Sequence, residues 1–321
     1  MSAWAVTAGH VREDGTVADP GGRAMPHEDR FDERSTRLVL DSVCRRVGLD
    51  GSGAELMRLG ENALYRLTGA SVVVRIARSM DYWADAVKEV KVSRWLIHRQ
   101  FPAAEIVNIS QPIEVAGHPV TFWRYIDGRD GVEKDGRALG VLLKGFHRLP
   151  PPDGFKLPVE DALGRVAARI DRAPVPPSDR SFLSDLYGQL AAEVARLRFP
   201  LPPGPTHGDA HVSNLMFKDG EPLLIDFERV SWGHPEWDLA VTATEYRSGG
   251  WWTNEEYGEF VDGYGFDVTD WAGFDVLRRT HEIKMTTWIM QRAGDSASFA
   301  AEYERRMRTI RGGSGGDWHP Y

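Results

Sequence analysis

Hydrophobic and polar positions in the first 130 residues change from helical spacing to alternation and back again. Apolar residues from Leu38 to Val47 recur at helical intervals, so the sequence predicts a helix from about Ser35 to Gly48. Five short apolar runs predict strands at 55–60, 63–68, 71–77, 106–115 and 118–126. A helix is predicted over 81–99. We therefore expect a five-stranded antiparallel sheet with one long helix inserted after its third strand.

The pattern beyond residue 131 is mainly helical. Apolar residues at helical spacing predict helices at 135–148, 159–171, 181–198, 238–247, 254–263, 270–292 and 297–311. One hairpin interrupts them, because NLMFK and EPLLID flank the turn residues Asp219-Gly220. The polar, glycine-containing segment 127–131 is the expected boundary between two lobes. The predicted organisation is an extension at 1–34, an N-terminal lobe at 35–127, a C-terminal lobe at 128–311 and a flexible tail at 312–321.

Composition and charge narrow the classes of function. The net charge is −8, and residues 181–321 hold 22 acidic against 13 basic residues, which argues against a nucleic-acid partner. A single cysteine, Cys44, excludes an internal disulfide framework and favours a reducing, cytoplasmic location. The N-terminus lacks the pattern of a signal peptide, and no apolar run approaches the length of a membrane span, so no membrane partner is expected. The sequence leaves the oligomeric state open.

A spaced set of polar residues at 207–238 carries the strongest chemical signal. The segment reads HGDAHVSN, then the hairpin, then IDFE and GHPEWDLA. Asp209 precedes Asn214 by five positions, and Asp226 follows across the hairpin, which folds the chain back on itself. Carboxylate and amide oxygens are the ligands that Mg²⁺ prefers, and a separate carboxylate is able to orient an acceptor hydroxyl. Phosphoryl transfer from a nucleotide requires both.

This segment resembles the motifs of the aminoglycoside phosphotransferase and choline kinase superfamily, a distant relative of the protein kinases. The resemblance implies an α+β, bilobal protein-kinase-like fold with a five-stranded antiparallel N-lobe and a mainly helical C-lobe that carries the catalytic hairpin. It also implies Asp209 as the catalytic base, Asn214 and Asp226 as ligands of Mg²⁺, and ATP or GTP as the phosphoryl donor. His207 and Asp238 are expected to support the loop, although Asp238 also fits an N-cap of the following helix.

The nucleotide half matches the superfamily through fewer positions. In LGENALYR, Gly60 and Asn62 match the family's glycine-poor phosphate loop, and a plain hairpin turn explains them equally well. Arg75 occupies the position of the lysine in protein kinases, and arginine is also able to bind phosphate. Glu89 is the residue expected to pair with Arg75 and orient it. The resemblance assigns adenine recognition to the backbone that follows the fifth strand and to packing beside Asp226, at Trp123, Arg124, Tyr125, Ile126 and Ile225.

Acidic and aromatic residues at 245–292 suit an acceptor that is cationic or sugar-bearing. Glu282 and Trp288 are the candidate contacts there, and Glu228, which follows Asp226-Phe227, is a candidate for the acceptor or for a second metal ion; all three equally fit a core or a solvated acidic surface. We predict an ATP-dependent O-phosphotransferase that acts on a hydroxyl of an aminoglycoside or another natural product, as in antibiotic resistance. A choline, ethanolamine or homoserine kinase is the first alternative. A catalytically silent kinase-fold binding protein is the second.

Overall fold

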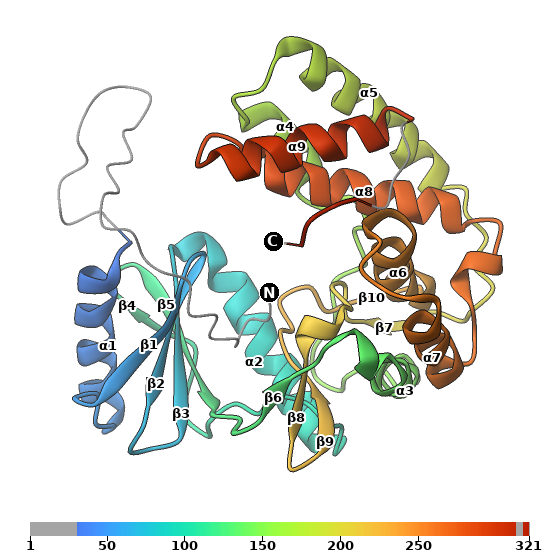
Figure 1. The fold of residues 1–321 in the computed structure, drawn as a ribbon. Helices are drawn as coiled ribbons and strands as arrows, with labels where there is room; N and C mark the ends of the chain where they lie inside the picture. Colours follow the sequence, from blue (N-terminus) through green and yellow to red (C-terminus); the bar gives the residue numbers. More distant parts are fainter. Residues whose placement is uncertain (1–30, 313–316, 321) are drawn as a thin grey trace. The chain divides into compact units, whose positions relative to one another are not determined.

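The structure is a computed structural model that describes residues 31–312 and 317–320 (Figure 1). Within these ranges the chain divides into two units. Residues up to 130, together with 216–228, form the first, here called the sheet unit. Residues 131–215 and those from 229 onward form the second, here called the helical unit. The chain therefore crosses between the units after residues 130, 215 and 228, and residues 1–30 of the predicted extension lie outside the described ranges.

The sheet unit is built on five antiparallel strands in the order β1-β2-β3-β5-β4 (Figure 1). The strands are β1 (Ala54–Leu59), β2 (Asn62–Leu67), β3 (Val72–Ala77), β4 (Ile113–Val115) and β5 (His118–Arg124). A short 3-10 turn, η2 (Met80–Tyr82), leads from β3 into α2 (Trp83–His98). This arrangement confirms the predicted five-stranded antiparallel sheet with one long helix after the third strand.

Helix α1 (Glu33–Val47) covers part of this sheet and supplies one side of its core. Leu40 and Val43 are fully buried against strand residues, whereas Leu38 is 66% exposed. The helix begins earlier than predicted because Asp32 is the N-cap, and Ser35 closes a capping box with it. The predicted N-cap, Ser35, is therefore wrong by three residues. Cys44 is a free, buried thiol in the same core.

A second, three-stranded sheet in the order β6-β8-β9 completes the sheet unit. It contains β6 (Arg129–Asp130), β8 (Leu215–Lys218) and β9 (Glu221–Leu224), and Arg129 pairs with Phe217. The predicted boundary segment 127–131 thus contains a strand that the sequence did not reveal. Gly128 is required there, because a Cβ atom would lie 1.9 Å from the Phe217 carbonyl oxygen. The predicted hairpin turn is present, with positive φ at Asp219 and Gly220.

Two predicted elements of the first 171 residues are shorter in the structure. The strand expected over 106–115 is reduced to β4, and Ile106 makes only an isolated bridge to Trp123. Pro112 lies within that run and has no N–H to donate to a sheet. The helix expected from 159 starts at Val166, because Val159 instead bridges to Trp232.

The helical unit contains seven α-helices and a two-stranded ribbon in the described ranges (Figure 1). The helices are α3 (Gly136–Phe146), α4 (Val166–Arg172), α5 (Pro177–Val194), α6 (Pro235–Thr244), α7 (Asn254–Tyr264), α8 (Phe274–Met290) and α9 (Ala297–Ile310). The ribbon pairs β7 (Gly204–Thr206) with β10 (Ser231–Gly233). Short helical turns occur at η3 (Glu133–Asp135), η4 (Val212–Asn214), η5 (Glu245–Gly249) and η6 (Val268–Asp270). None of the helices in these ranges has the length and hydrophobicity that a membrane crossing needs.

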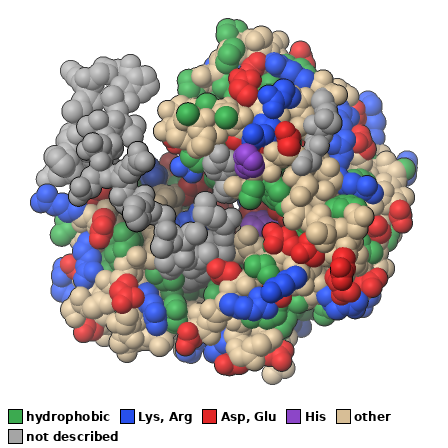
Figure 2. Space-filling model, viewed as in Figure 1, with side chains coloured by type: hydrophobic (Ala, Val, Ile, Leu, Met, Phe, Trp, Pro, Cys, Tyr) green, Lys and Arg blue, Asp and Glu red, His purple; other side chains and the backbone are tan. Residues whose placement is uncertain are grey.

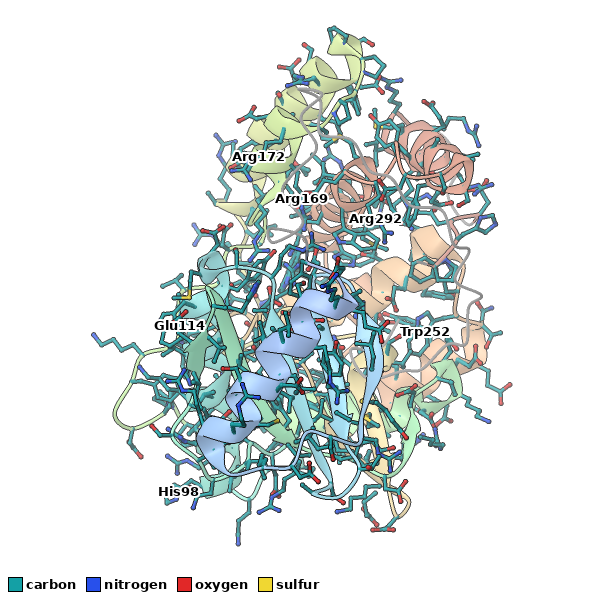
Figure 3. The ribbon with its side chains drawn as sticks, turned by 90° about the vertical axis from the view of Figure 1, so that its left-hand side faces the viewer. His98, Glu114, Arg169, Arg172, Trp252 and Arg292 are labelled. Carbon is teal, nitrogen blue, oxygen red and sulfur yellow. The ribbon has the colours of Figure 1, made fainter. Side chains whose placement is uncertain are left out.

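Two packing features fix the frame of the helical unit. Helix α6 is buried along its whole length, as expected for a central helix. Helix α3 approaches α7 closely, because Cβ atoms at Gly140 and Gly263 would each lie 2.4 Å from a backbone oxygen of the opposite helix. Helices α4, α5, α8 and α9 share a separate core, while Arg172 on α4 is exposed (Figure 3). Acidic and basic side chains are interspersed on the face of the described residues in Figure 2.

The last described residues, 317–320, differ from the expected flexible tail. Trp318 is 3% exposed, and its indole nitrogen donates to Thr309 Oγ1 at 3.0 Å. Its carbonyl oxygen accepts a hydrogen bond from the Trp251 indole at 2.7 Å. Burial of a large aromatic side chain holds this segment on α9.

Candidate active site

The loop that carries Asp209 leaves β7 and is held by one buried carboxylate. Asp238 is fully buried, and its two oxygens accept hydrogen bonds from the backbone nitrogens of His207 at 2.6 Å and Gly208 at 2.7 Å. The same carboxylate forms a hydrogen bond with His147 Nε2, at a distance of 2.9 Å. Helix α6 begins at Pro235, so Asp238 lies inside the helix and the N-cap alternative is excluded. Gly208 has a φ of 80°, and a Cβ there would lie 2.6 Å from the Arg229 carbonyl oxygen.

Asp209 itself has cationic groups on two sides. Its Oδ2 atom lies 3.7 Å from Arg229 Nε and 3.8 Å from His211 Nε2, and the side chain is 39% exposed. Burial opposes ionisation, but His211 and Arg229 outweigh it and hold the pKa of Asp209 well below its usual range. Asp209 consequently raises the pKa of His211 against the effect of burial. Asp209 is therefore ionised at neutral pH and accepts hydrogen bonds, as a residue that orients an acceptor hydroxyl must.

Asn214 closes the same loop at the end of η4. Its side chain is nearly buried, and Nδ2 donates to the Asp209 carbonyl oxygen at 2.8 Å. The same nitrogen lies 3.2 Å from His211 Nε2. These contacts use the amide nitrogen and leave the Oδ1 atom as the group suited to a hard cation.

Asp226 follows β9 in the sheet unit and has an unusual backbone. Its φ is 65°, in the left-handed region that non-glycine residues rarely adopt. Four other non-glycine residues in the described ranges share a positive φ, and all four lie in turns: Ser71, Gln100, Ala116 and Asp219. Asp226 is not in a turn, and such a conformation costs about 1–3 kcal/mol. Strain of this size is typical of residues whose orientation matters for function.

Arg75 on β3 organises the rest of the sheet-unit site. Its guanidinium donates to Glu89 Oε1 on α2 at 2.6 Å and to Glu228 Oε2 at 3.2 Å. With its amide oxygen facing Arg75, Asn62 accepts from the guanidinium at 3.0 Å. Burial raises the pKa of Glu89 to about 8, and Asp226 and Glu228 add to this rise while Arg75 opposes it. Even with Glu89 mainly protonated at neutral pH, the two carboxylates of Asp226 and Glu228 outnumber the single guanidinium of Arg75, which leaves this site with an excess of negative charge.

The residues assigned to the metal fit Mg²⁺ by their chemistry. Asn214 offers an amide oxygen and Asp226 a carboxylate, both hard donors. In the ranges that the structure describes, no group of three or more His, Cys, Asp and Glu side chains is placed to hold a metal ion. Mg²⁺ is commonly held by one or two protein oxygens together with phosphates and water. The donor set therefore suits an ion that binds together with a nucleotide.

Comparison with known proteins identifies the family. The model of the phosphotransferase enzyme family matches residues 59–277, a span that includes Arg75, Asp209, Asn214 and Asp226. The chain belongs to this family. No match is found among curated proteins.

Solved structures similar to this phosphotransferase share its kinase-like fold at low sequence identity. Amicoumacin kinase hAmiN, solved with AMP-PNP, Ca²⁺ and Ami, has 18% identity and a TM-score of 0.66, with 87% of this chain and 95% of that chain covered. Choline kinase LicA from Streptococcus pneumoniae has 14% identity and a TM-score of 0.63, with 84% and 98% covered. Aminoglycoside phosphotransferase APH(3'')-Id from Streptomyces rimosus has 18% identity and a TM-score of 0.54, with 77% and 98% covered.

The remaining nucleotide candidates of the phosphotransferase lie within the sheet unit. Gly60 donates its N–H to the Asn62 carbonyl oxygen at 3.0 Å, and its nearest obstacle to a Cβ is 3.9 Å away, so the turn does not require glycine. After β5, the backbone nitrogens of Arg124 and Tyr125 donate to Glu105 and Ser71. These two amides are therefore already used within the fold. Trp123, Ile126 and Ile225 are buried.

The three candidate acceptor contacts each have partners within their own unit. Glu228 pairs with Arg75 in the sheet unit. Glu282 on α8 is buried, accepts from Ser248 Oγ at 2.5 Å and pairs with Arg278, so its charge is used inside the fold. Trp288 packs against the core of α4, α5, α8 and α9. The carboxylate-rich acceptor site expected from the sequence therefore gains no support from these residues.

Sequence reasoning missed three residues that the fold places around Asp209. Arg229, three positions after Asp226, was not recognised as a neighbour of the Asp209 carboxylate. Lys284 on α8 interacts electrostatically with Asp209, and burial together with the charge of Arg229 lowers its pKa to about 7. Burial and the charge of Lys284 lower the pKa of His281 to about 3, which keeps its imidazole neutral. No local pattern identifies Lys284 or His281, because α8 reaches the loop only through tertiary packing.

Proposed function

We propose that this phosphotransferase moves the γ-phosphoryl group of ATP or GTP to a hydroxyl of a small molecule. The observation that carries the proposal is the loop before Asp209, where one buried carboxylate, that of Asp238, holds two successive backbone amides. This clamp fixes the backbone beside a carboxylate that its cationic neighbours keep ionised. Membership of the phosphotransferase family supports the reaction class. Arg75, with Glu89 and Glu228 holding its guanidinium, supports a phosphate-binding role in the sheet unit.

The proposed chemistry gives each residue one task. Asp209 accepts a hydrogen bond from the acceptor hydroxyl and directs its oxygen toward the γ-phosphorus. An oxygen–phosphorus bond then forms while the bond from that phosphorus to the β–γ bridging oxygen breaks, leaving a nucleoside diphosphate. The hydroxyl proton passes to Asp209, and it does so late, because the low pKa of this carboxylate makes it a weak base. Mg²⁺, held by Asn214 and Asp226, would offset the charge of the phosphates.

The acceptor we propose first is a hydroxyl-bearing natural product, an aminoglycoside being one class. Two of the similar structures are named as kinases of antibiotics, amicoumacin and an aminoglycoside, which supports this choice. A small metabolite such as choline, ethanolamine or homoserine is the second candidate, supported by the similar choline kinase. We place the reaction in the cytoplasm, where nucleoside triphosphates are plentiful and the buried Cys44 thiol stays reduced.

The test is a screen of hydroxylated antibiotics and metabolites with Mg²⁺ and either ATP or GTP. Products are identified by mass spectrometry as acceptors that have gained one phosphoryl group, and nucleoside diphosphate release is measured in parallel. At least one acceptor is expected to be phosphorylated by the wild-type protein and not by Asp209→Asn. Calorimetry with Mg²⁺ and AMP-PNP separates the silent-binder alternative, because a protein without nucleotide affinity at millimolar concentration is not a phosphotransferase. Transfer by Asp209→Asn at the wild-type rate would show the assigned mechanism to be wrong.

A further inference from the structure

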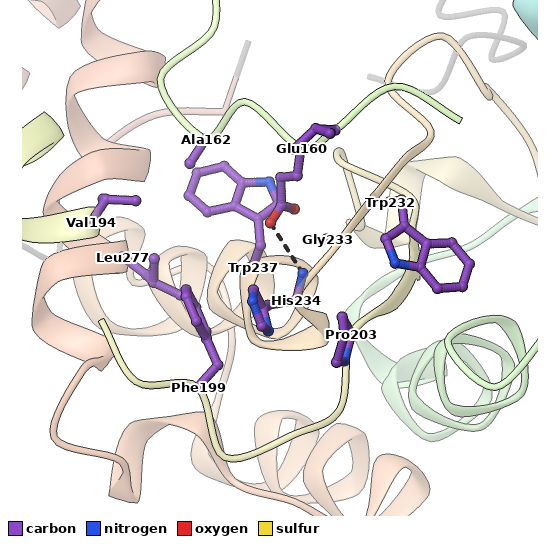
Figure 4. Close-up of a pocket in the computed structure, with 11 residues that line it drawn as sticks. Glu160, Ala162, Val194, Phe199, Pro203, Trp232, Gly233, His234, Trp237 and Leu277 are labelled. Carbon is purple, nitrogen blue, oxygen red and sulfur yellow. Dashed lines mark hydrogen bonds between the residues drawn. The ribbon is translucent and has the colours of Figure 1, made fainter. Parts of the chain in front are cut away.

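A pocket of about 400 Å³ opens in the helical unit beside β10 and the start of α6 (Figure 4). Its walls are mainly aromatic and aliphatic, and include Phe199, Trp232, Trp237 and Leu277. This volume lies within the range of small-molecule sites, which are typically apolar with a few polar groups that fix orientation. The proposed phosphoryl transfer uses none of the residues that line this pocket.

Two polar groups in the pocket have buried atoms without a partner. Glu160 Oε2 accepts from the His234 backbone nitrogen at 3.3 Å, and the Thr206 hydroxyl is near enough to oppose the rise in the pKa of this carboxyl group, but Oε1 is buried and makes no hydrogen bond in the described residues. His234 Nδ1 is likewise buried and unpartnered in the same ranges. Phe199 stacks on the His234 ring with centroids 3.9 Å apart, which fixes the ring plane. Buried polar atoms are nearly always partnered in folded proteins, so these two atoms point to a ligand.

Both groups are suited to an uncharged ligand. Burial, with Asp238 adding to it, raises the pKa of Glu160 to about 8, so its carboxyl group is mainly protonated at neutral pH. Burial lowers the pKa of His234, which keeps its imidazole neutral. The pocket therefore presents a neutral O–H and a neutral imidazole nitrogen between apolar walls.

Two side chains of the helical unit, Trp237 and Lys284, link the pocket to Asp209 by a chain of interactions. Trp237 lines the pocket, and the Lys284 ammonium lies 4.3 Å from its ring centroid. Lys284 in turn interacts electrostatically with both Glu160 and Asp209. Along the chain, Trp232 follows Arg229 by three residues, so their Cα atoms are at most about 11 Å apart. A molecule anchored in the pocket is thus within one extended molecule's length of the reacting carboxylate.

We propose that this pocket binds an uncharged, hydrophobic ring of the acceptor, whose hydroxyl reaches Asp209. The inference rests on the proposed function and narrows its acceptor to hydroxylated molecules with a neutral ring system, in place of polycationic sugars. The charges beside Asp209 agree, because Arg229 and the protonated fraction of Lys284 repel an ammonium group, while burial raises the pKa of the neighbouring Glu245 to about 7 and so reduces its negative charge. The carboxylate of Glu282, which would attract one, already pairs with Arg278.

The first test measures binding of 2-(2-naphthyl)ethanol, a neutral fused-ring alcohol, to the full-length protein by saturation-transfer NMR. Ala162→Phe and Val194→Phe each place a ring into the pocket, and Val141→Phe adds the same ring to an exposed site on α3 as a matched control. Binding is expected to weaken at least about tenfold in either pocket variant and to stay unchanged in the control. Absence of binding to the wild type at millimolar concentration, or equal affinity in folded pocket variants, would overturn the inference.

The second test separates this inference from the proposed function. For acceptors with a hydrophobic ring, Ala162→Phe is expected to raise KM at least about tenfold, with kcat for a small polyol acceptor unchanged. If no acceptor is phosphorylated while the NMR pattern holds, the pocket stands as a ligand site and the proposed function fails. If phosphorylation occurs with the same KM in Ala162→Phe and wild type, the function stands and the inference fails. Phosphorylation of polycationic aminoglycosides alone would also refute it.

Discussion

The candidate site residues of the sheet unit and those of the helical unit have opposite charge balances. In the sheet unit, the Arg75 guanidinium is contacted by Glu89 and Glu228, and Asp226 adds a third carboxylate to its surroundings. In the helical unit, Asp209 has the cationic groups of His211, Arg229 and Lys284 around it, and the buried carboxyl group of Glu245 interacts with both Asp209 and His211. The first half lacks positive charge, and the second has it in excess.

The residues around Arg75 therefore need a bound ligand to balance their charge, whereas the fold itself already balances the charge of Asp209. An uncompensated buried charge is costly, so the carboxylates around Arg75 favour the arrival of a cation with its phosphates. Asp209 needs no ligand to stay ionised, because its cationic neighbours already hold its pKa low. The nucleotide half is therefore expected to respond to bound ions, and the catalytic loop to be preorganised without them.

Removing the carboxylate of Asp209 is the most severe test of the preorganised half. Asp209→Asn keeps the size of the side chain but removes the charged acceptor for the hydroxyl, so kcat should fall by about 10³ or more. Nucleotide affinity, measured by calorimetry, should change less than about twofold. The matched control is Asp219→Asn in the hairpin turn, where Asn tolerates the positive φ. Retention of a tenth of wild-type kcat by Asp209→Asn would contradict the comparison.

Asp238→Ala should cause the largest loss of stability. The change leaves the His207 and Gly208 amides and the His147 ring without their buried acceptor, at a cost of about 3–4 kcal/mol in the free energy of unfolding. Urea denaturation of the two proteins measures this difference. Asp262→Ala is the control, because this exposed carboxylate pairs with exposed Arg137 and its loss should cost less than about 1 kcal/mol. Equal losses for the two variants would mean that Asp238 does not hold the loop.

Arg75 variants test the half that a ligand completes. Arg75→Met removes the positive charge from among three carboxylates, and the Kd for Mg²⁺ with AMP-PNP should rise by about 10–100-fold. Arg75→Lys should give an intermediate value, because one ammonium group cannot reproduce the planar contacts to Glu89 and Glu228. Arg46→Lys on α1 should leave this affinity unchanged. An unaltered Kd in Arg75→Met would remove Arg75 from the phosphate site.

Glu160 should give the smallest effect, a pH dependence of stability. Burial raises its folded-state pKa from 4.5 to about 8, so between these values the folded protein holds a proton that the unfolded chain has released. Wild-type stability should therefore decline as pH rises through this window, relative to Glu160→Gln. Urea denaturation of both proteins at pH 5 and pH 8 measures it. A constant difference between the two proteins at both pH values would exclude the raised pKa.

The sheet could be predicted from the sequence because its strands are short, apolar and bounded by turns. The errors have physical causes. In a capping box, two residues each accept a hydrogen bond from the other's backbone N–H, and here these residues are Asp32 and Ser35. Both are common N-cap residues, and in the structure the N-cap is Asp32. Val159 forms a bridge to Trp232, a contact that lies 73 positions away in the sequence and leaves no local pattern. The tail buries Trp318, although its glycine-rich composition suggests a loose chain.

Prediction of the site depended on how local each contact is. Asp209, Asn214 and Asp226 could be proposed because their spacing along one strip is itself the signal. Arg229 follows Asp226 by three positions, yet only the fold shows that its guanidinium lies 3.7 Å from Asp209. Lys284 and Glu160 lie on distant segments and reach this region by tertiary packing alone. The charges of Arg229 and Lys284 had no part in the expected acceptor site, which rested on the acidic and aromatic residues at 245–292.

The placement of residues 216–228 in the sheet unit has a consequence for how the chain is made. During synthesis the N-terminal sheet is available early, but the strands that complete its unit, β8 and β9, leave the ribosome only after 85 residues of the helical unit have emerged. The sheet unit therefore cannot be completed until this late segment is made, and an N-terminal fragment that ends near residue 130 lacks part of the sheet unit. Asp226 belongs to this late segment, so the protein should acquire the carboxylate that we propose as a metal ligand only when most of the chain has been translated.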